Sequence, residues 1–118
     1  MYGIPDNVDW TFLIGQEVLQ ICIGSNQVQV NCDDVSISIE SNYAHVSKQG
    51  MVFEQCDGMP RQSVTLISLL QSKVSSVVRE NCKTLALHFS NGETLRLFDD
   101  NPQYECFQIA TRDRFIVV

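Results

Sequence analysis

The chain has 118 residues, and 44% of them are hydrophobic, which suffices for a folded domain with a modest core and excludes a disordered chain. Its formal net charge of −6 disfavours nucleic acid and anionic membranes as partners, because both are bound mainly by Lys and Arg. The charge favours a basic partner, or serves only solubility. No apolar run approaches the ~20 residues of a membrane span. Residues 1–6 lack the features of a signal peptide, so a cytoplasmic protein is expected.

The first half begins with a predicted helical turn. Asp9 can cap a short helix over residues 10–14, which Gly15 would end. Residues 18–23 are then predicted to form a buried strand, because β-branched and apolar residues dominate them.

Two alternating strands follow, at residues 28–32 and 35–39. The apolar residues have even numbers in the first strand and odd numbers in the second. In an antiparallel hairpin, they all face the core only if the loop holds an even number of residues. We therefore predict a two-residue turn at Asp33-Asp34, with Val30 opposite Ile37.

Residues 41–62 lose this periodicity and are interpreted as a long connection, with a short strand at residues 51–53 as its only candidate element. Ser63 is predicted to cap a helix over residues 64–70, followed by a strand at residues 74–78. The expected apolar face of that helix consists of Val64, Ile67 and Leu70.

The clearest hairpin lies between residues 85 and 98, where apolar side chains fall on every second residue. Leu87 can lie opposite Leu95 only if the loop holds an odd number of residues. We predict the loop Ser90-Asn91-Gly92, with Gly92 in the left-handed conformation.

A last hairpin is predicted from strands at residues 104–109 and 114–118. Matching Ile109 with Phe115 again requires an odd loop, here residues 111–113.

The two halves of the chain look alike: a short helix, a strand and a hairpin occur in residues 9–41 and again in residues 63–99. The C-terminal strands at residues 104–118 are an addition. The sequence thus predicts a single domain over residues 1–118 with an α+β, mostly β fold. In it, two helix–strand–hairpin repeats build antiparallel sheet around one core, and a C-terminal hairpin follows.

Several segments together resemble a family of small bacterial proteins that is a domain of unknown function. They are Leu13-Ile14-Gly15-Gln16-x-Val18, Leu85-x-Leu87-x-Phe89-x-Asn91-Gly92 and Tyr104-Glu105-Cys106-Phe107. The last motif usually reads Tyr-Glu-Ala-Trp in that family, and the glycine-rich tail that often follows it is missing here. Small acidic proteins of this kind resemble immunity proteins of bacterial toxin systems, including contact-dependent growth inhibition, so the resemblance implies a toxin-binding role.

The residues themselves carry little catalytic signal: no P-loop, dinucleotide fingerprint or nucleophile elbow occurs, and the chain is not expected to be an enzyme or to need a cofactor. A pair of Cys56 and His45 is a conceivable nucleophile and base. The acidic residues between Asp99 and Glu105 could ligate calcium, but a solvated turn is the preferred interpretation, and no metal is predicted. The five cysteines are odd in number and lack a CxxC pair, which favours reduced thiols.

We therefore predict a non-catalytic binding module that occludes a basic, nuclease-type toxin through an acidic surface. The alternative is a small-ligand or metal-binding domain that uses the connection over residues 43–57. The candidate partner-binding residues are Asp33, Asp34, Asp99, Asp100, Tyr104 and Glu105.

Overall fold

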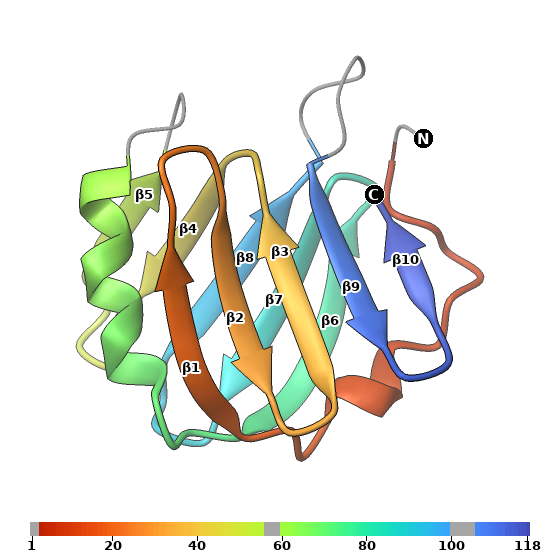
Figure 1. The fold of residues 1–118 in the computed structure, drawn as a ribbon, viewed down its shortest axis with the longest axis horizontal. Coiled ribbons are helices and arrows are strands. Elements are labelled where there is room, and N and C mark those ends of the chain that lie inside the picture. Colours follow the sequence, from red (N-terminus) through yellow and green to blue (C-terminus); the bar gives the residue numbers. More distant parts are fainter. Residues whose placement is uncertain (1–2, 56–59, 100–105) are drawn as a thin grey trace.

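The computed structural model describes residues 3–55, 60–99 and 106–118. Two five-stranded antiparallel sheets pack face to face (Figure 1). The strand order is β1-β2-β3-β9-β10 in the sheet nearer the viewer, the front sheet, and β5-β4-β8-β7-β6 in the back sheet. The mostly β character predicted from the sequence is confirmed. Both helices that the structure describes are 3₁₀ helices, and no helix among the described residues is long and apolar enough to cross a membrane.

The elements are η1 (Trp10–Leu13), β1 (Val18–Ile23), β2 (Val28–Cys32), β3 (Val35–Ile39), β4 (Tyr43–Val46), β5 (Val52–Gln55), η2 (Pro60–Leu69), β6 (Val74–Asn81), β7 (Thr84–Phe89), β8 (Thr94–Phe98), β9 (Phe107–Thr111) and β10 (Phe115–Val117).

Two of the predicted hairpins have the predicted register. Leu87 lies opposite Leu95, and Gly92 in the connecting loop has a φ of +90°. Val30 lies opposite Ile37, so the turn is Asp33-Asp34. Side-chain parity therefore determined both loop lengths correctly.

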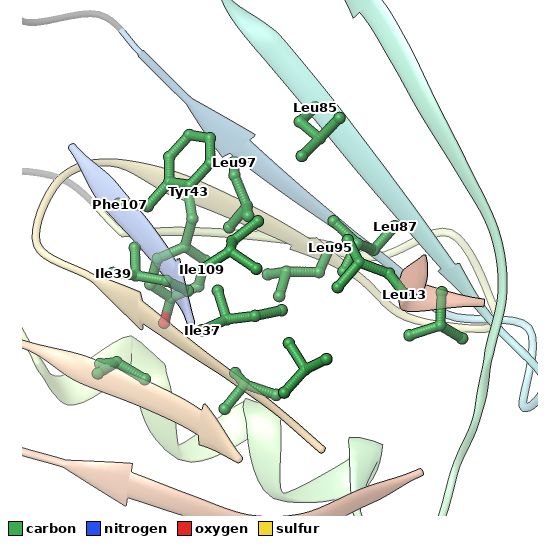
Figure 2. Close-up of a cluster of buried hydrophobic side chains, with 14 of the residues drawn as sticks. Leu13, Ile37, Ile39, Tyr43, Leu85, Leu87, Leu95, Leu97, Phe107 and Ile109 are labelled. Carbon is green, nitrogen blue, oxygen red and sulfur yellow. The ribbon is translucent and has the colours of Figure 1, made fainter. Parts of the chain in front are cut away.

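The core lies between the two sheets and is one continuous cluster (Figure 2). Each fully buried leucine or isoleucine in it contributes about 1.5–3 kcal/mol relative to an exposed one. The back sheet contributes mainly leucines and the front sheet mainly β-branched residues, and the side chains labelled in Figure 2 are Leu13, Ile37, Ile39, Tyr43, Leu85, Leu87, Leu95, Leu97, Phe107 and Ile109.

Two short segments cover the open sides of this sandwich. Helix η2 runs along one side and contacts the edge strands β1 and β5 (Figure 1). On the opposite side η1 contacts β6, and the Ile4 N–H donates to the Cys82 carbonyl. Covered edges matter because a free sheet edge pairs readily with other chains.

The prediction of a long connection over residues 41–62 is wrong, although its short candidate strand at residues 51–53 overlaps β5. Strands β4 and β5 form a hairpin there, and β4 is an interior strand of the back sheet, between β5 and β8. Tyr43, Ala44 and His45 are all buried, so β4 lacks the alternation of apolar and polar residues that reveals a strand with one wet face.

The predicted face of the second helix is also wrong. Val64 and Ile67 are 57% and 50% exposed, whereas Leu66 and Leu69 are fully buried. A 3₁₀ helix has three residues per turn, so residues three apart lie on the same side of it. Val64 and Ile67 therefore share one side, and Leu66 and Leu69 share another, which packs on the core. The helix begins at Pro60, so Ser63 lies inside it and does not cap it.

Two strand predictions need a correction. Only Val18 of β1 is fully buried, because β1 is an edge strand. In the C-terminal hairpin Ile109 lies opposite Ile116 and not Phe115, which is 66% exposed. The shift allows Val118 to enter the core, where its backbone bonds to Phe107.

Backbone hydrogen bonds join the two sheets where β1 and β6 begin, and each sheet contributes one donor and one acceptor. The Gly15 N–H donates to the Val74 carbonyl and the Gln71 N–H to the Val18 carbonyl. Gly15 and Gln71 both have positive φ, at +89° and +69°. A register shift follows Val18 in β1 and Val74 in β6. The same backbone features, a positive φ before the strand and a register shift after its first residue, thus occur at the start of β1 and of β6.

Candidate functional site

The predicted partner-binding residues do not form one surface. Asp33 and Asp34 are exposed in the turn at the lower end of the front sheet in Figure 1, whereas Asp99 follows β8 at the upper end. The other three predicted residues, Asp100, Tyr104 and Glu105, lie outside the described residues.

Asp99 is a buried structural residue, so its prediction as a surface contact is wrong. Its side chain is fully buried and accepts hydrogen bonds from the Gly3 N–H and from the Cys106 thiol, the latter over 3.3 Å. Asp99 therefore joins the N-terminal segment to the start of the C-terminal hairpin. The alternation contained the signal, because Asp99 has the same parity as Leu95 and Leu97 and points inward with them.

The Asp33-Asp34 turn is held by the loop that precedes β1. The Glu17 N–H donates to Asp33 Oδ2 over 3.2 Å, and the Asp34 N–H donates to Gln16 Oε1 over 2.8 Å. Among the non-glycine residues that the structure describes, only Gln71 has positive φ, so the turn is formed without left-handed aspartates. Both carboxylates thus project from a fixed backbone.

Asp34 lines a surface hollow of about 460 Å³ between three separate segments of the chain. The other walls come from η1 and from the turn between β9 and β10, and include Phe12, Arg112, Asp113 and Arg114. The Arg114 guanidinium lies 5.1 Å from the centroid of the Phe12 ring, a cation–π contact. This hollow, which we call the turn pocket, combines both signs of charge with an aromatic face.

Within the part of the chain that the structure describes, no ion pair joins the aspartates of the turn pocket to its arginines. These charges therefore remain available to a partner. Asp9 adds a further anion beside them, since the hydroxyl and backbone N–H of Thr11 hold the pKa of Asp9 below its usual range. The turn pocket itself is balanced, with Asp34 and Asp113 against Arg112 and Arg114. Asp9, Glu17 and Asp33 are further acidic groups at this end of the sandwich, and Lys48 and Lys73 are further basic ones.

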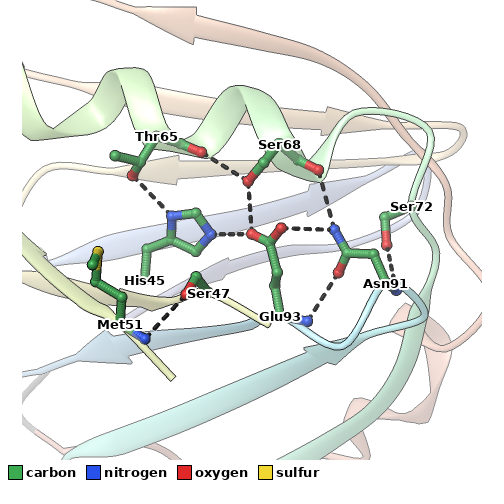
Figure 3. A network of polar contacts seen from close by, with 8 residues as sticks. All are labelled: His45, Ser47, Met51, Thr65, Ser68, Ser72, Asn91 and Glu93. Atoms are coloured by element: carbon green, nitrogen blue, oxygen red, sulfur yellow. Dashed lines mark hydrogen bonds and ion pairs between the residues drawn. The ribbon is translucent and has the colours of Figure 1, made fainter. Parts of the chain in front are cut away.

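A second cluster, a buried polar network, links η2 to the back sheet (Figure 3). His45 is 1% exposed, and its Nδ1 lies 2.8 Å from Thr65 Oγ1 while its Nε2 bonds to Glu93. The Glu93 carboxylate also accepts from Ser68 Oγ over 2.7 Å and from Asn91 Nδ2 over 3.1 Å. Sequence reasoning missed this network because its members come from a strand, a helix and a hairpin loop.

The corresponding positions of the front sheet are apolar. His45 lies opposite Leu95 in the back sheet, as Ile109 lies opposite Ile37 in the front sheet. Glu93 stands two residues before Leu95, as the buried Val35 stands two before Ile37. The architecture can therefore be built with an apolar pair here, and the polar pair is an addition to it.

The order of groups in this network is hydroxyl, imidazole, carboxylate, which is the order that activates a hydroxyl in serine hydrolases. Thr65 is half-buried, whereas His45 is 1% exposed. Cys56, the nucleophile that the sequence pairs with His45, lies outside the described residues. The network joins helix η2 to the back sheet.

Cys22, Cys32 and Cys82 carry free thiols. Burial, and secondly the nearby Asp33 carboxylate, raises the pKa of the Cys32 thiol to about 12, so this sulfur is unreactive near neutrality. A search of the described residues found no group of three His, Cys, Asp or Glu side chains that could hold a metal ion.

A scan against protein-family models found no match, and neither did searches of the curated proteins and of the solved structures.

Proposed function

We propose that this protein is a non-catalytic binding module that neutralises a basic protein toxin by covering its active site, as immunity proteins do. The observation that carries the proposal is the exposed Asp33-Asp34 turn, held on a fixed backbone in a chain with a net charge of −6. A nuclease active site is cationic because it holds phosphates, so an acidic surface complements it. The encounter is proposed to occur in the cytoplasm, where the thiols stay reduced.

The turn pocket supplies side chains for short-range contacts, which a complex needs in addition to long-range electrostatic attraction. The charges of Asp34 and Arg114 can pair across an interface, and arginine is among the residues enriched in binding hot spots. Long-range attraction would set the association rate, and the close pairs would set the dissociation rate.

The experiment that tests this function uses the product of the neighbouring gene as the binding partner. The full chain should form a complex with it and suppress its toxicity in co-expressing cells. The variant Asp33→Lys/Asp34→Lys should lose most of that suppression. A control with the same change in net charge is Asp6→Lys/Glu54→Lys, whose two side chains are exposed elsewhere, and it should keep the suppression. Absence of a complex, or equal loss in both variants, would refute the proposal.

A second candidate function is a small-ligand or hydrolytic role for the hairpin over residues 43–55. The polar network favours it, because Thr65, His45 and Glu93 are joined in the order that activates a hydroxyl. A fluorophosphonate probe followed by mass spectrometry tests it: labelling of Thr65 that His45→Ala abolishes would support this function, and no labelling would exclude it.

We also infer that the two halves of the chain arose by duplication of a helix–strand–hairpin unit. The reciprocal hydrogen bonds of Gly15 and Gln71, and the equal bulges after Val18 and Val74, support this inference. Positions where the halves differ in chemistry then indicate where one half acquired a role of its own.

A further inference from the structure

The strands of the front sheet contribute no charged side chain to its outer face. At the border of that face, the carboxylate of Glu40, which follows β3, accepts a hydrogen bond from Gln108 Nε2 over 2.9 Å. None of the residues in β1, β2, β3, β9 and β10 is Asp, Glu, Lys, Arg or His. The outer face of the back sheet, built on the same plan, carries Glu54, His88 and Arg96. In a chain with a net charge of −6, a neutral sheet face is a distinctive feature.

Amides and hydroxyls occupy this neutral face. Strand pairing places the outward-facing residues in two rows that cross the sheet. The first row is Gln20, Asn31, Ser36, Ala110 and Phe115, and the second is Cys22, Gln29, Ser38, Gln108 and Val117. Six of these ten residues carry an amide or a hydroxyl. Ser36 Oγ donates to Asn31 Oδ1 over 2.5 Å, and Asn31 Nδ2 donates to Gln20 Oε1 over 3.1 Å. These lateral bonds fix the side chains in position before any ligand arrives.

The face also has two hollows and an exposed aromatic residue at its edge. A hollow of about 410 Å³ includes Cys22 and Gln29. Another of about 320 Å³, at the opposite end of β2, includes Asn31 and Ser36 and is bordered by Asp33, Asp34 and Arg112 of the adjoining turns. Phe115 is 66% exposed beside the small Ala110, which leaves its ring open.

We propose that this face binds a neutral oligosaccharide, a function distinct from toxin binding. Each amide and hydroxyl both donates and accepts hydrogen bonds, as sugar hydroxyls do. A phosphate or carboxylate ligand would find no cation on these strands, and a lipid would leave the amides unsatisfied. The open Phe115 ring can pack on the apolar C–H face of a pyranose. A sugar chain would lie across β2, β3 and β9 and end on Phe115.

The test is an NMR titration of the full ¹⁵N-labelled chain with three neutral hexaoses: maltohexaose, cellohexaose and N-acetylchitohexaose. At least one should shift the backbone amides of β2, β3 and β9 in a saturable way. Gln29→Ala and Phe115→Ala should each weaken that binding by roughly three- to tenfold, the range expected for one net contact. Thr94→Ala is the matched control, because Thr94 lies opposite His88 in the back sheet as Ser36 lies opposite Asn31 in the front sheet.

A second variant removes the neutrality itself. Ser38 in the front sheet corresponds to Arg96 in the back sheet, so the fold should tolerate Ser38→Arg. Well-dispersed amide signals will verify that the variant is folded. This variant should lose hexaose binding. The proposal is overturned if no hexaose shifts these strands at millimolar concentration, or if binding survives Gln29→Ala, Phe115→Ala and Ser38→Arg unchanged.

Discussion

The buried pair of His45 and Glu93 should be replaceable as a pair but not singly. Replacing Glu93 with Val alone leaves the His45 Nε2 without its partner at a site that is 1% exposed. It also removes one of the two acceptors of Ser68 Oγ, the other being the Thr65 carbonyl. Replacing His45 with Ile alone leaves a buried carboxylate with fewer donors. The double replacement His45→Ile/Glu93→Val introduces the apolar pair that Ile109 and Val35 form in the front sheet.

The magnitudes follow from the burial of both groups. Each single variant should lose about 2–4 kcal/mol of unfolding free energy, between the cost of an unsatisfied polar group and that of a broken buried ion pair. The double variant should lie within about 1 kcal/mol of the parent, because apolar replacement of a buried pair is often neutral or stabilising. Thr65 is half-buried, so its hydroxyl can turn to water.

Urea denaturation of the parent, both single variants and the double variant at pH 7 completes the cycle. The single variants should melt roughly 8–16 °C below the parent and the double variant near it. If the double variant is as unstable as the two single losses added together, the correspondence between the two sheets at these positions is wrong.

Three further outcomes are expected. Asp99→Ala should cost about 1–3 kcal/mol in a urea titration, because it orphans buried donors, and should leave toxin affinity unchanged. Gln71→Gly should stabilise the fold by up to about 1 kcal/mol in the same assay, because Gln71 has left-handed φ. Brief iodoacetamide treatment of the native chain at pH 8, followed by peptide mass spectrometry, should modify the exposed Cys82 and spare Cys32, since the raised pKa keeps the Cys32 thiol protonated; equal labelling would contradict this.

Alternation of apolar residues predicted the fold wherever a strand has one dry and one wet face. It determined the registers of Val30 with Ile37 and of Leu87 with Leu95. It failed in β4, where consecutive residues including His45 are buried. It also failed at the C-terminus, because the burial of Val118 shifts the last hairpin by one residue.

Of the candidate site, the sequence predicted only the feature formed by neighbouring residues, the Asp33-Asp34 turn. Parity located the Asp33-Asp34 turn, and the same parity would have turned Asp99 inward had its charge not suggested a surface residue. The turn pocket was not predictable, because it forms only when β3 pairs with β9 and brings Arg112 and Arg114 beside η1. Such pairing between distant segments leaves no local pattern in the sequence.

The most direct test of the binding function is the association rate constant with the neighbouring gene product, measured by stopped flow at low and high salt. Asp33→Lys/Asp34→Lys should slow association by about tenfold at low salt and flatten its salt dependence, while Asp6→Lys/Glu54→Lys changes both much less. We expect this separation because the proposal places the steering charges on the Asp33-Asp34 turn. Equal rates and equal salt slopes for the two double variants would contradict it.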